Sequence, residues 1–309
     1  MSDAAAAAST APRAPLRQLL RGVVDYAGLF PPAGLPMAGA VEQYARHRQE
    51  PSAWMLGRFV LPAARLDEFE AAAAAHLPRE SASWWSLSAL LSSDIEEDLA
   101  RVERFNDRHR DARHGAALVD TVELKAHSVQ DVAHAAGVVQ RQFDTYMEIP
   151  VAEDPAELVA AIGTARAKAK IRTGGTTADA FPPTAQVIRF IARCIAHGVP
   201  FKATAGLHHP WRGEYRLTYE PDADRGHMFG FLNVLLATAA LHAGAGEQEA
   251  AAILDERHPD AVEIGGDSVR VGGRTIAPDA LLRARDSMTS FGSCSFAEPV
   301  GDLRAQGLL

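Results

Sequence analysis

The sequence predicts an α/β protein of the (β/α)8 barrel type, and three observations support this. Short segments with strand-like alternation are repeatedly followed by helical segments, a pattern typical of parallel strands joined by helical crossovers. Seven such units and a closing segment near the C-terminus supply eight strands. Cationic side chains also lie on one face of two of these strands, opposite an apolar face. An open sheet covered on both faces would bury those charges away from water, whereas a closed barrel places them in its interior.

The expected elements alternate along the chain. The strands are 23–29, 55–61, 83–91, 117–126, 145–151, 167–172, 200–205 and 290–296. The helices are 38–47, 66–76, 94–108, 130–142, 155–166, 184–197 and 278–286. An open doubly wound sheet is the competing interpretation, but no Gly-rich phosphate-binding loop follows the first strand.

The segment 211–277 is too long for one ordinary crossover. It contains an expected hairpin at 215–225, helices at 227–242 and 248–257, and a Gly-rich hairpin at 264–276. We expect an insertion between strands seven and eight that forms either a lid or an oligomer interface. Residues 15–309 are then a single barrel domain, and the Ala/Ser/Thr/Pro-rich residues 1–14 a disordered tail.

Composition excludes several classes of partner. The net charge of -8 and the lack of a basic patch argue against nucleic acid, and no apolar run reaches membrane-spanning length. The two cysteines suit a reducing cytoplasm, and Cys294 is expected to be a small buried residue because no histidine stands at a known spacing from it. We expect a cytoplasmic protein that binds a small molecule, needs no cofactor and can form a homo-oligomer.

The lysines point to the candidate site. Of 31 Lys and Arg residues only four are lysine, namely Lys125, Lys168, Lys170 and Lys202, and each lies on an expected strand. Lysine differs from arginine in having an amine that burial and nearby cations can deprotonate. Strand alternation puts two sets of residues on the interior face, Lys168, Lys170 and Arg172 in one strand and Lys202, Thr204 and Gly206 in the next.

The same alternation brings carboxylates to that interior. Glu123 and Lys125 share a face of the fourth strand, Glu148 faces inward from the fifth, and Asp25 from the first. Amines and carboxylates that converge in this way suit imine chemistry. One lysine, kept neutral by a cationic neighbour, attacks a carbonyl to give a Schiff base, and a carboxylate or the second lysine moves the proton. The competing interpretation is a salt-bridged interior that only fixes strand register.

Two of these segments carry recognisable motifs. Lys170-Ile-Arg-Thr173-Gly174 and Phe201-Lys202-Ala-Thr-Ala-Gly206 resemble the sixth-strand and seventh-strand signatures of class I aldolases of the 2-deoxyribose-5-phosphate aldolase type, and Phe291-Gly292-Ser293 resembles their phosphate site. The resemblance covers strands four to eight. It implies that Lys170 forms the Schiff base, that Lys202 lowers its pKa, and that a small, anionic oxo compound is cleaved. The family's fourth-strand Asp has no clean counterpart, since Asp120, Glu123 and Lys125 are all candidates.

The chain is also similar to a group of bacterial barrel proteins without assigned activity. The likeness lies in Asp25-Tyr-Ala-Gly-Leu-Phe-Pro-Pro and Ala205-Gly-Leu-His-His-Pro. It implies a fold and no function.

Histidines offer a second functional interpretation. His208, His209 and His227 with Glu148 suggest a metal-dependent hydrolase or lyase, although their spacing matches no established ligand motif. Without a metal, His208 and His209 are expected to lie in a polar loop and to hydrogen-bond either substrate or backbone. A third interpretation is a barrel that binds a small anion without turning it over. The full set of expected substrate-binding residues is Asp25, Arg172, Thr173, Gly174, Thr204, Gly206, His208, His209, Arg212 and Ser293.

Overall fold

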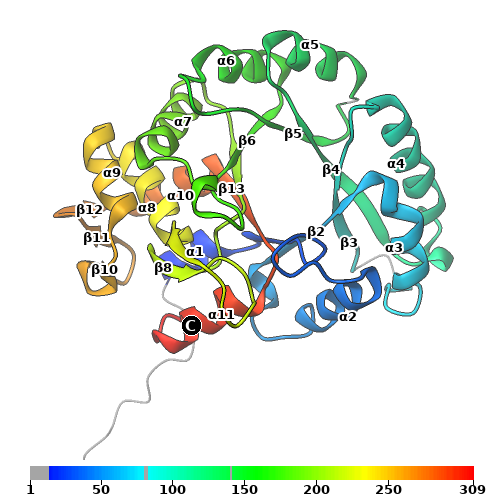
Figure 1. Ribbon diagram of the computed structural model, residues 1–309, viewed down its shortest axis with the longest axis horizontal. Coiled ribbons are helices and arrows are strands. Elements are labelled where there is room, and N and C mark those ends of the chain that lie inside the picture. The colour runs from blue at the N-terminus through cyan, green and yellow to red at the C-terminus, as the bar shows by residue number, and fades with distance from the viewer. Residues whose placement is uncertain (1–13, 80–82, 140) are drawn as a thin grey trace, which may run out of the picture.

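Eight parallel strands close into a barrel in the computed structural model, which describes residues 14–79, 83–139 and 141–309 (Figure 1). Around the barrel the order is β1-β13-β7-β6-β5-β4-β3-β2. The strands are β1 (Val24–Tyr26), β2 (Leu56–Pro62), β3 (Trp85–Leu90), β4 (Ala117–Lys125), β5 (Asp144–Glu148), β6 (Lys168–Arg172), β7 (Phe201–Thr204) and β13 (Met288–Ser293). The expected (β/α)8 barrel is confirmed, and each observed strand overlaps an expected one.

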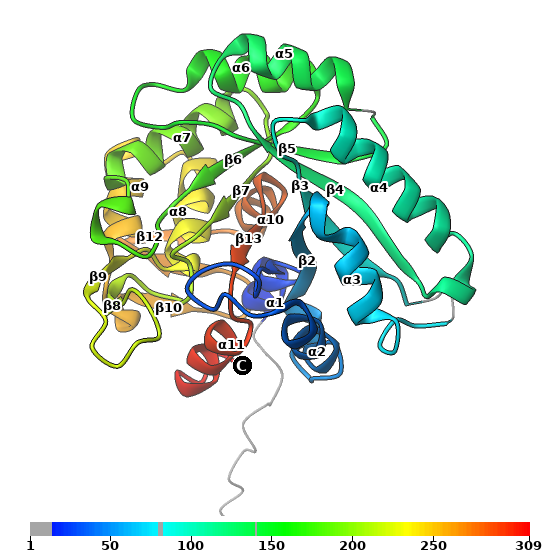
Figure 2. The same ribbon diagram turned by 45° about the vertical axis from the view of Figure 1, so that its right-hand side comes forward.

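Helices follow one another around the outside of the barrel (Figures 1 and 2). Those after the first six strands are α2 (Met37–His47), α3 (Leu66–Ala73), α4 (Ile95–His109), α5 (Val129–Val138), α6 (Ala156–Ala165) and α7 (Thr184–Ala196). Local sequence sets their starts. The Asp94 side chain accepts a hydrogen bond from Glu97 N at the start of α4, and Ser128 and Asp131 form a capping box on α5.

Two helices were not expected from the sequence. Helix α1 (Ala14–Leu20) packs against α10 (Pro278–Ser287), and α11 (Ala297–Ala305) follows the last barrel strand. Ala14 therefore belongs to a helix rather than to the expected tail, whose residues 1–13 lie outside the described part of the chain. Short 3-10 helices connect several elements, namely η1 (Ala53–Met55), η2 (Ala63–Arg65), η3 (Ala112–His114), η4 (Ala178–Ala180) and η5 (Pro259–Ala261).

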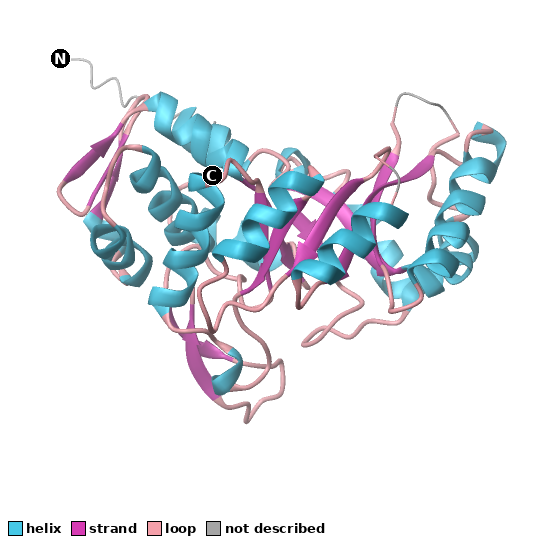
Figure 3. Ribbon diagram, turned by 90° about the horizontal axis from the view of Figure 1, so that it is seen from above, coloured by secondary structure: helices cyan, strands magenta, loops and turns pink. Residues whose placement is uncertain are grey.

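The insertion between β7 and β13 contains two small sheets that lie outside the barrel (Figure 3). Its elements are the hairpin β8 (Gly213–Arg216) and β9 (Arg225–Met228), helices α8 (Phe231–His242) and α9 (Glu247–Asp255), the antiparallel sheet β10 (Val262–Ile264), β11 (Val269–Val271) and β12 (Arg274–Ile276), and helix α10 (Pro278–Ser287). Helix α8 is apolar and buried along most of its length, and its Phe231 ring stacks on Phe291 of β13 at 4.9 Å. The buried Asn233 side chain accepts a hydrogen bond from Arg212 N at 2.8 Å. Its amide nitrogen donates to Ile253 O and Glu256 O, at the C-terminal end of α9, at 2.9 Å each.

Side chains fill the barrel interior in layers. On β5 these are Asp144 at the N-terminal end, Tyr146 in the middle and Glu148 at the C-terminal end. The N-terminal layer holds three ion pairs: Arg58 Nε to Asp120 Oδ1 at 2.6 Å, Arg58 Nη2 to Asp144 Oδ2 at 3.7 Å, and Lys168 Nζ to Asp144 Oδ1 at 2.8 Å. The buried Tyr146 above this layer shares a hydrogen bond with Thr289 Oγ1 at 2.6 Å.

The outward faces of the same strands pack under helices. Ala169 and Ile171 of β6 and Ala203 of β7 are buried, and the Phe201 ring meets Phe190 of α7 at 5.5 Å. Alternation therefore predicted correctly which side chains point inward. No helix among the described residues has the length and apolarity needed to cross a membrane.

Candidate active site

Two lysines and three carboxylates meet near the C-terminal ends of the barrel strands. Lys202 Nζ lies 2.6 Å from Asp25 Oδ2 and 2.7 Å from Glu123 Oε1. Lys170 Nζ lies 2.8 Å from Glu123 Oε2 and 2.9 Å from Glu148 Oε2. Glu123 thus bridges the two amines. We call Asp25, Glu123, Glu148, Lys170 and Lys202 the lysine–carboxylate cluster.

The parallel register of the strands explains this convergence. Lys170 pairs with Glu148 on one side and with Lys202 on the other, so the three side chains lie at one height in the barrel. Three further hydrogen bonds fix the carboxylates: Ser88 Oγ donates to Glu123 Oε1 at 2.6 Å, Ser290 Oγ donates to Asp25 Oδ2 at 2.7 Å, and Arg58 N donates to Asp25 Oδ1 at 2.9 Å. The cluster is therefore held by neighbouring strands rather than by loops.

Burial and mutual attraction act against each other in the cluster. Burial disfavours the ionised form of Glu123, but the ammonium groups of Lys170 and Lys202 outweigh it and hold the pKa of Glu123 well below its usual range. Burial likewise disfavours the charged form of Lys202, yet Asp25 and Glu123 raise its pKa. With five ionised groups the cluster carries three negative and two positive charges.

The pKa of Lys170 is shifted in the direction opposite to expectation. Burial lowers it and so does the charge of Lys202, but the carboxylates of Glu123 and Glu148 together raise it above the ordinary value. The sequence led us to expect an amine kept neutral by Lys202. The structure corrects this, because two carboxylates within 2.9 Å of Nζ favour the ammonium form.

A cavity of about 850 Å³ opens over the cluster at the C-terminal face. Nine of the expected site residues line it: Lys170, Lys202, Glu123, Glu148, Lys125, Arg172, Thr204, Gly206 and His208. The loop Phe30-Pro31-Pro32 after β1 forms part of its wall, and Leu217 and Met228 reach it from the β8–β9 hairpin. This part of the insertion therefore covers the candidate site, whereas none of the residues of β10 to β12 lines it.

Two cations at the cavity wall are free of carboxylate partners. Arg172 at the end of β6 and Lys125 at the end of β4 are exposed, and neither makes an ion pair or a side-chain hydrogen bond within the described residues. They differ in this from Lys170 and Lys202, whose charges are matched by carboxylates. An anionic group in the cavity would find an unmatched guanidinium there.

Several expected substrate-binding residues have structural roles instead. Asp25 is buried below the cavity and bound to Lys202. Thr173 Oγ1 donates to Ala205 O at 2.8 Å and so fixes the turn after β7, where Gly206 has a φ of 73°. Gly174 packs against the Phe181 ring, and Ser293 Oγ accepts a hydrogen bond from Ser295 N. None of Asp25, Thr173, Gly174 and Ser293 lines the cavity.

His209 and Arg212 also lie away from the cavity lining. The His209 ring stacks on Tyr215 at 3.5 Å, and its Nδ1 lies 2.6 Å from Asp302 Oδ2 of α11. Arg212 Nη1 pairs with Asp255 Oδ1 at 3.1 Å at the end of α9. Both expectations are corrected, since carboxylates from later segments hold these two side chains.

The predicted metal site is not formed. His208 Nδ1 lies 2.9 Å from Glu298 Oε2, His209 faces Asp302, His227 lies on the exposed part of β9, and Glu148 faces Lys170. Within the described part of the chain, no three His, Cys, Asp or Glu side chains come together as metal ligands. The expectation fails because each residue has another partner.

Cys294 is buried, as the sequence predicted, but its position at the cavity wall was not expected. Its Sγ lies 4.0 Å from His208 Nε2. Glu298 of the unexpected helix α11 holds the other nitrogen of that ring. The sequence signal that could have indicated this helix was the spacing of Glu298 and Asp302, one helical turn apart.

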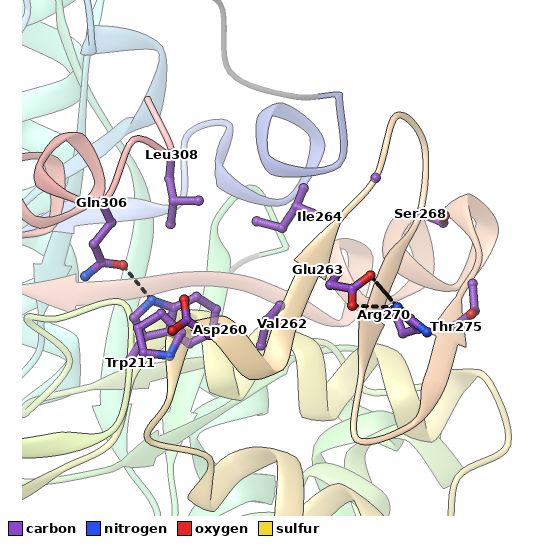
Figure 4. Close-up of a pocket in the computed structure, with 12 residues that line it drawn as sticks. Trp211, Asp260, Val262, Glu263, Ile264, Ser268, Arg270, Thr275, Gln306 and Leu308 are labelled. Carbon is purple, nitrogen blue, oxygen red and sulfur yellow. Dashed lines mark hydrogen bonds and ion pairs between the residues drawn. The ribbon is translucent and has the colours of Figure 1, made fainter.

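A second cavity, of about 690 Å³, lies outside the barrel (Figure 4). It is bounded by Trp211, the sheet β10–β12 and the C-terminal segment, where Trp211 Nε1 donates to Gln306 Oε1 at 2.6 Å. Its charged pair, Glu263 and Arg270, is satisfied within the sheet. None of the described residues that line this cavity is a lysine, histidine or cysteine, so the cluster remains the candidate site.

Comparisons of the chain with protein-family models, curated proteins and solved structures gave no match. The class is therefore defined by the fold and the site alone. The protein is a (β/α)8 barrel with a buried lysine–carboxylate cluster under a cavity at its C-terminal face, and barrels of this type commonly carry enzymatic sites at that face.

Proposed function

We propose that the protein is a lyase of the class I aldolase type, which forms a Schiff base between Lys170 and a small anionic oxo compound. One observation carries the proposal. A lysine amine lies at the base of a cavity within 2.9 Å of two carboxylates, and a second lysine shares one of them. A nucleophile, a proton acceptor and a fixed charge are thus present at one site.

Glu148 is the better proton acceptor for Lys170. The Glu123 side chain is 3% exposed, binds both amines and Ser88, and has a pKa far below the usual range, so it binds a proton poorly. The Glu148 side chain is 17% exposed and contacts Lys170 alone among the amines. Because Lys170 is protonated in the resting site, transfer of its proton to Glu148 is the step that frees the amine for attack.

Lys202 is assigned a different role. With Asp25 and Glu123 at 2.6 and 2.7 Å, it stays an ammonium ion and cannot act as the nucleophile. Its charge opposes the protonation of Lys170 and favours release of the proton. In the proposed reaction the iminium formed at Lys170 withdraws electrons from the adjacent bond, which then breaks.

The substrate class follows from the cavity wall. Arg172 and Lys125 are the cations available to a ligand, and the guanidinium of Arg172 suits the two oxygens of a carboxylate or phosphate. The excess negative charge of the cluster would repel an anion near Lys170 itself. The anionic group is therefore expected at the rim, with the carbonyl directed inward.

Reductive trapping tests the proposal. The protein is incubated with small aldehydes and oxo acids in the presence of borohydride, and the adduct is located by peptide mass spectrometry. We expect modification of Lys170 in the wild type and in Lys168→Gln, and its loss in Lys170→Gln. Lys168 is the matched control, since it lies on the same face of β6 but pairs with Asp144 at the opposite end of the barrel.

Two results would count against an aldolase-type site. An adduct that is absent from all four lysines over a broad panel would refute Schiff-base formation. Protection of the protein against heat by an anionic ligand, without an adduct or a product, would favour the anion-binding barrel.

A further inference from the structure

We propose that Cys294 is a second nucleophile in the cavity, activated by His208 and Glu298, which adds reversibly to the carbonyl carbon of small aldehydes. The inference concerns the β13 side of the cavity, while the Schiff base is assigned to β6. Its choice of aldehydes as ligands rests on the proposed function, whereas the reactivity of the thiol does not.

The three side chains come from separate parts of the chain. Cys294 follows β13, His208 lies in the loop after β7, and Glu298 lies in the first turn of α11. His208 Nδ1 is 2.9 Å from Glu298 Oε2, and its Nε2 is 4.0 Å from Cys294 Sγ. The carboxylate thus fixes the ring so that the second nitrogen is directed at the sulfur, the arrangement that activates cysteine nucleophiles.

The surroundings favour the charged form of the histidine. Burial disfavours the imidazolium, but the interactions with Cys294 and Glu298 outweigh it and raise the pKa of His208 to about 9. His208 is 7% exposed, and within the described residues Nε2 has the Cys294 sulfur as its hydrogen-bonding partner. Such a cation beside a thiol increases its nucleophilicity near neutral pH.

Access separates Cys294 from the other cysteine. Cys294 and His208 are 5% and 7% exposed, and both line the cavity of about 850 Å³, so a ligand there would lie beside them. Cys194 is fully buried in α7, away from the cavity, and burial raises its pKa well above the ordinary value. The chain thus contains an unreactive thiol as an internal reference.

Other titratable groups face the sulfur. The Tyr219 hydroxyl, from the loop between β8 and β9, lies 3.5 Å from Sγ and 2.8 Å from Glu298 Oε2. Tyr26 of β1 also interacts electrostatically with Cys294. Burial raises the pKa of both tyrosines, so both are neutral between pH 6 and 9 and His208 is the group that provides positive charge.

The addition is balanced without a co-reactant. A sulfur lone pair forms the S–C bond, the π electrons of the C=O bond move to oxygen, and that oxygen takes the proton shared by Sγ and His208 Nε2. The product is a hemithioacetal, and the reverse reaction releases the aldehyde. No oxidant or reductant is involved.

Alkylation by iodoacetamide under native conditions tests the activation. The rate at each cysteine is measured by peptide mass spectrometry at pH 6.5 and pH 9.5 in the wild type, His208→Asn and Glu298→Gln. We expect the rate at Cys294 to fall at least tenfold in His208→Asn at pH 6.5 and to stay within about threefold at pH 9.5. A smaller fall in the same direction is expected for Glu298→Gln.

Cys194 reports on folding in the same samples. If Cys194 is alkylated in His208→Asn, that variant has lost its native packing. The alkylation rate of Cys294 in Glu298→Gln then decides whether the thiol is activated. Rates at Cys294 that equal those of the wild type at both pH values, in a variant with unreactive Cys194, would overturn the activation.

The carbonyl step is tested in Lys170→Gln, so that Schiff-base formation at that residue does not contribute. Acetaldehyde is expected to slow alkylation of Cys294 at least threefold, with recovery on dialysis, while ethanol at the same concentration has no effect. Equal rates with acetaldehyde and ethanol would refute the addition and would leave the proposed role of Lys170 unaffected.

Discussion

Replacing Glu123 with Gln tests the electrostatic account of the cluster. Glu123 is 2% exposed and binds Lys170 and Lys202 at 2.8 and 2.7 Å. Removing one partner of a buried ion pair costs about 3–5 kcal/mol. Glutamine retains an oxygen acceptor, and Asp25 and Glu148 remain beside the amines, so we expect the lower end, about 3 kcal/mol in the free energy of unfolding at pH 7.

The pH dependence of this loss gives a sharper measurement. The pKa of Glu123 is depressed in the folded protein. The stability that this carboxylate contributes is therefore fully present above its pKa in the unfolded chain, and it falls as the pH drops toward its pKa in the folded protein. One pH unit corresponds to about 1.4 kcal/mol and the unfolded pKa is about 4.3, so the difference between wild type and Glu123→Gln should shrink by about 2 kcal/mol from pH 7 to pH 3.

Urea unfolding followed by circular dichroism at pH 7, 5 and 3 measures both quantities. Glu68→Gln is the matched control, because Glu68 pairs with Arg65 at 2.7 Å on the surface and its removal should leave the unfolding free energy essentially unchanged. A loss below about 1 kcal/mol for Glu123→Gln at pH 7, or a loss that is equal at pH 7 and pH 3, would refute the reasoning.

Three further predictions concern the site and the turn beside it. Adduct formation at Lys170, measured by borohydride trapping and intact mass, should accelerate several-fold from pH 7 to pH 9.5, because the raised pKa keeps the amine protonated at neutral pH; a flat profile would contradict this. Arg172→Gln should weaken trapping of glyoxylate about tenfold and leave acetaldehyde unchanged, because only the acid needs the guanidinium; equal effects on both would exclude a charge-specific role. Gly206→Ala should lower the unfolding free energy by about 1–2 kcal/mol in urea titrations, since φ is 73° and the new Cβ would lie 2.7 Å from Phe181 Cε1; an unchanged midpoint would show that the turn tolerates a side chain.

Alternation along the strands predicted the barrel and the inward direction of the cluster residues, because period-two patterns specify faces directly. Alternation does not give height in the barrel. Lys168 and Lys170 share a face, yet Lys168 pairs with Asp144 in the N-terminal layer while Lys170 lies in the cluster. Likewise, the sign of a pKa shift depends on how many carboxylates reach an amine, which requires the register between strands.

Partners from unexpected segments account for the wrong assignments. Helix α11 contains Pro299 and Gly301, both weak helix formers, so the one-turn spacing of Glu298 and Asp302 was not enough to predict a helix. Glu298 and Asp302 were therefore not recognised as the partners of His208 and His209, and the histidines were considered as metal ligands instead. Arg212 was assigned to substrate for a different reason: its partner Asp255 lies in an expected helix of the insertion, but the sequence does not show that this helix packs beside Arg212.

Tyr146 is buried beneath the cluster, and below it the ion pairs of Arg58 and Lys168 fill the N-terminal layer of the barrel. The cavity opens over Lys170 at the opposite end, so a ligand would approach the cluster from the C-terminal face. A bound molecule that fills this cavity would separate the five charged groups from the solvent on that side, and proton exchange with Lys170 would slow while the molecule stays bound.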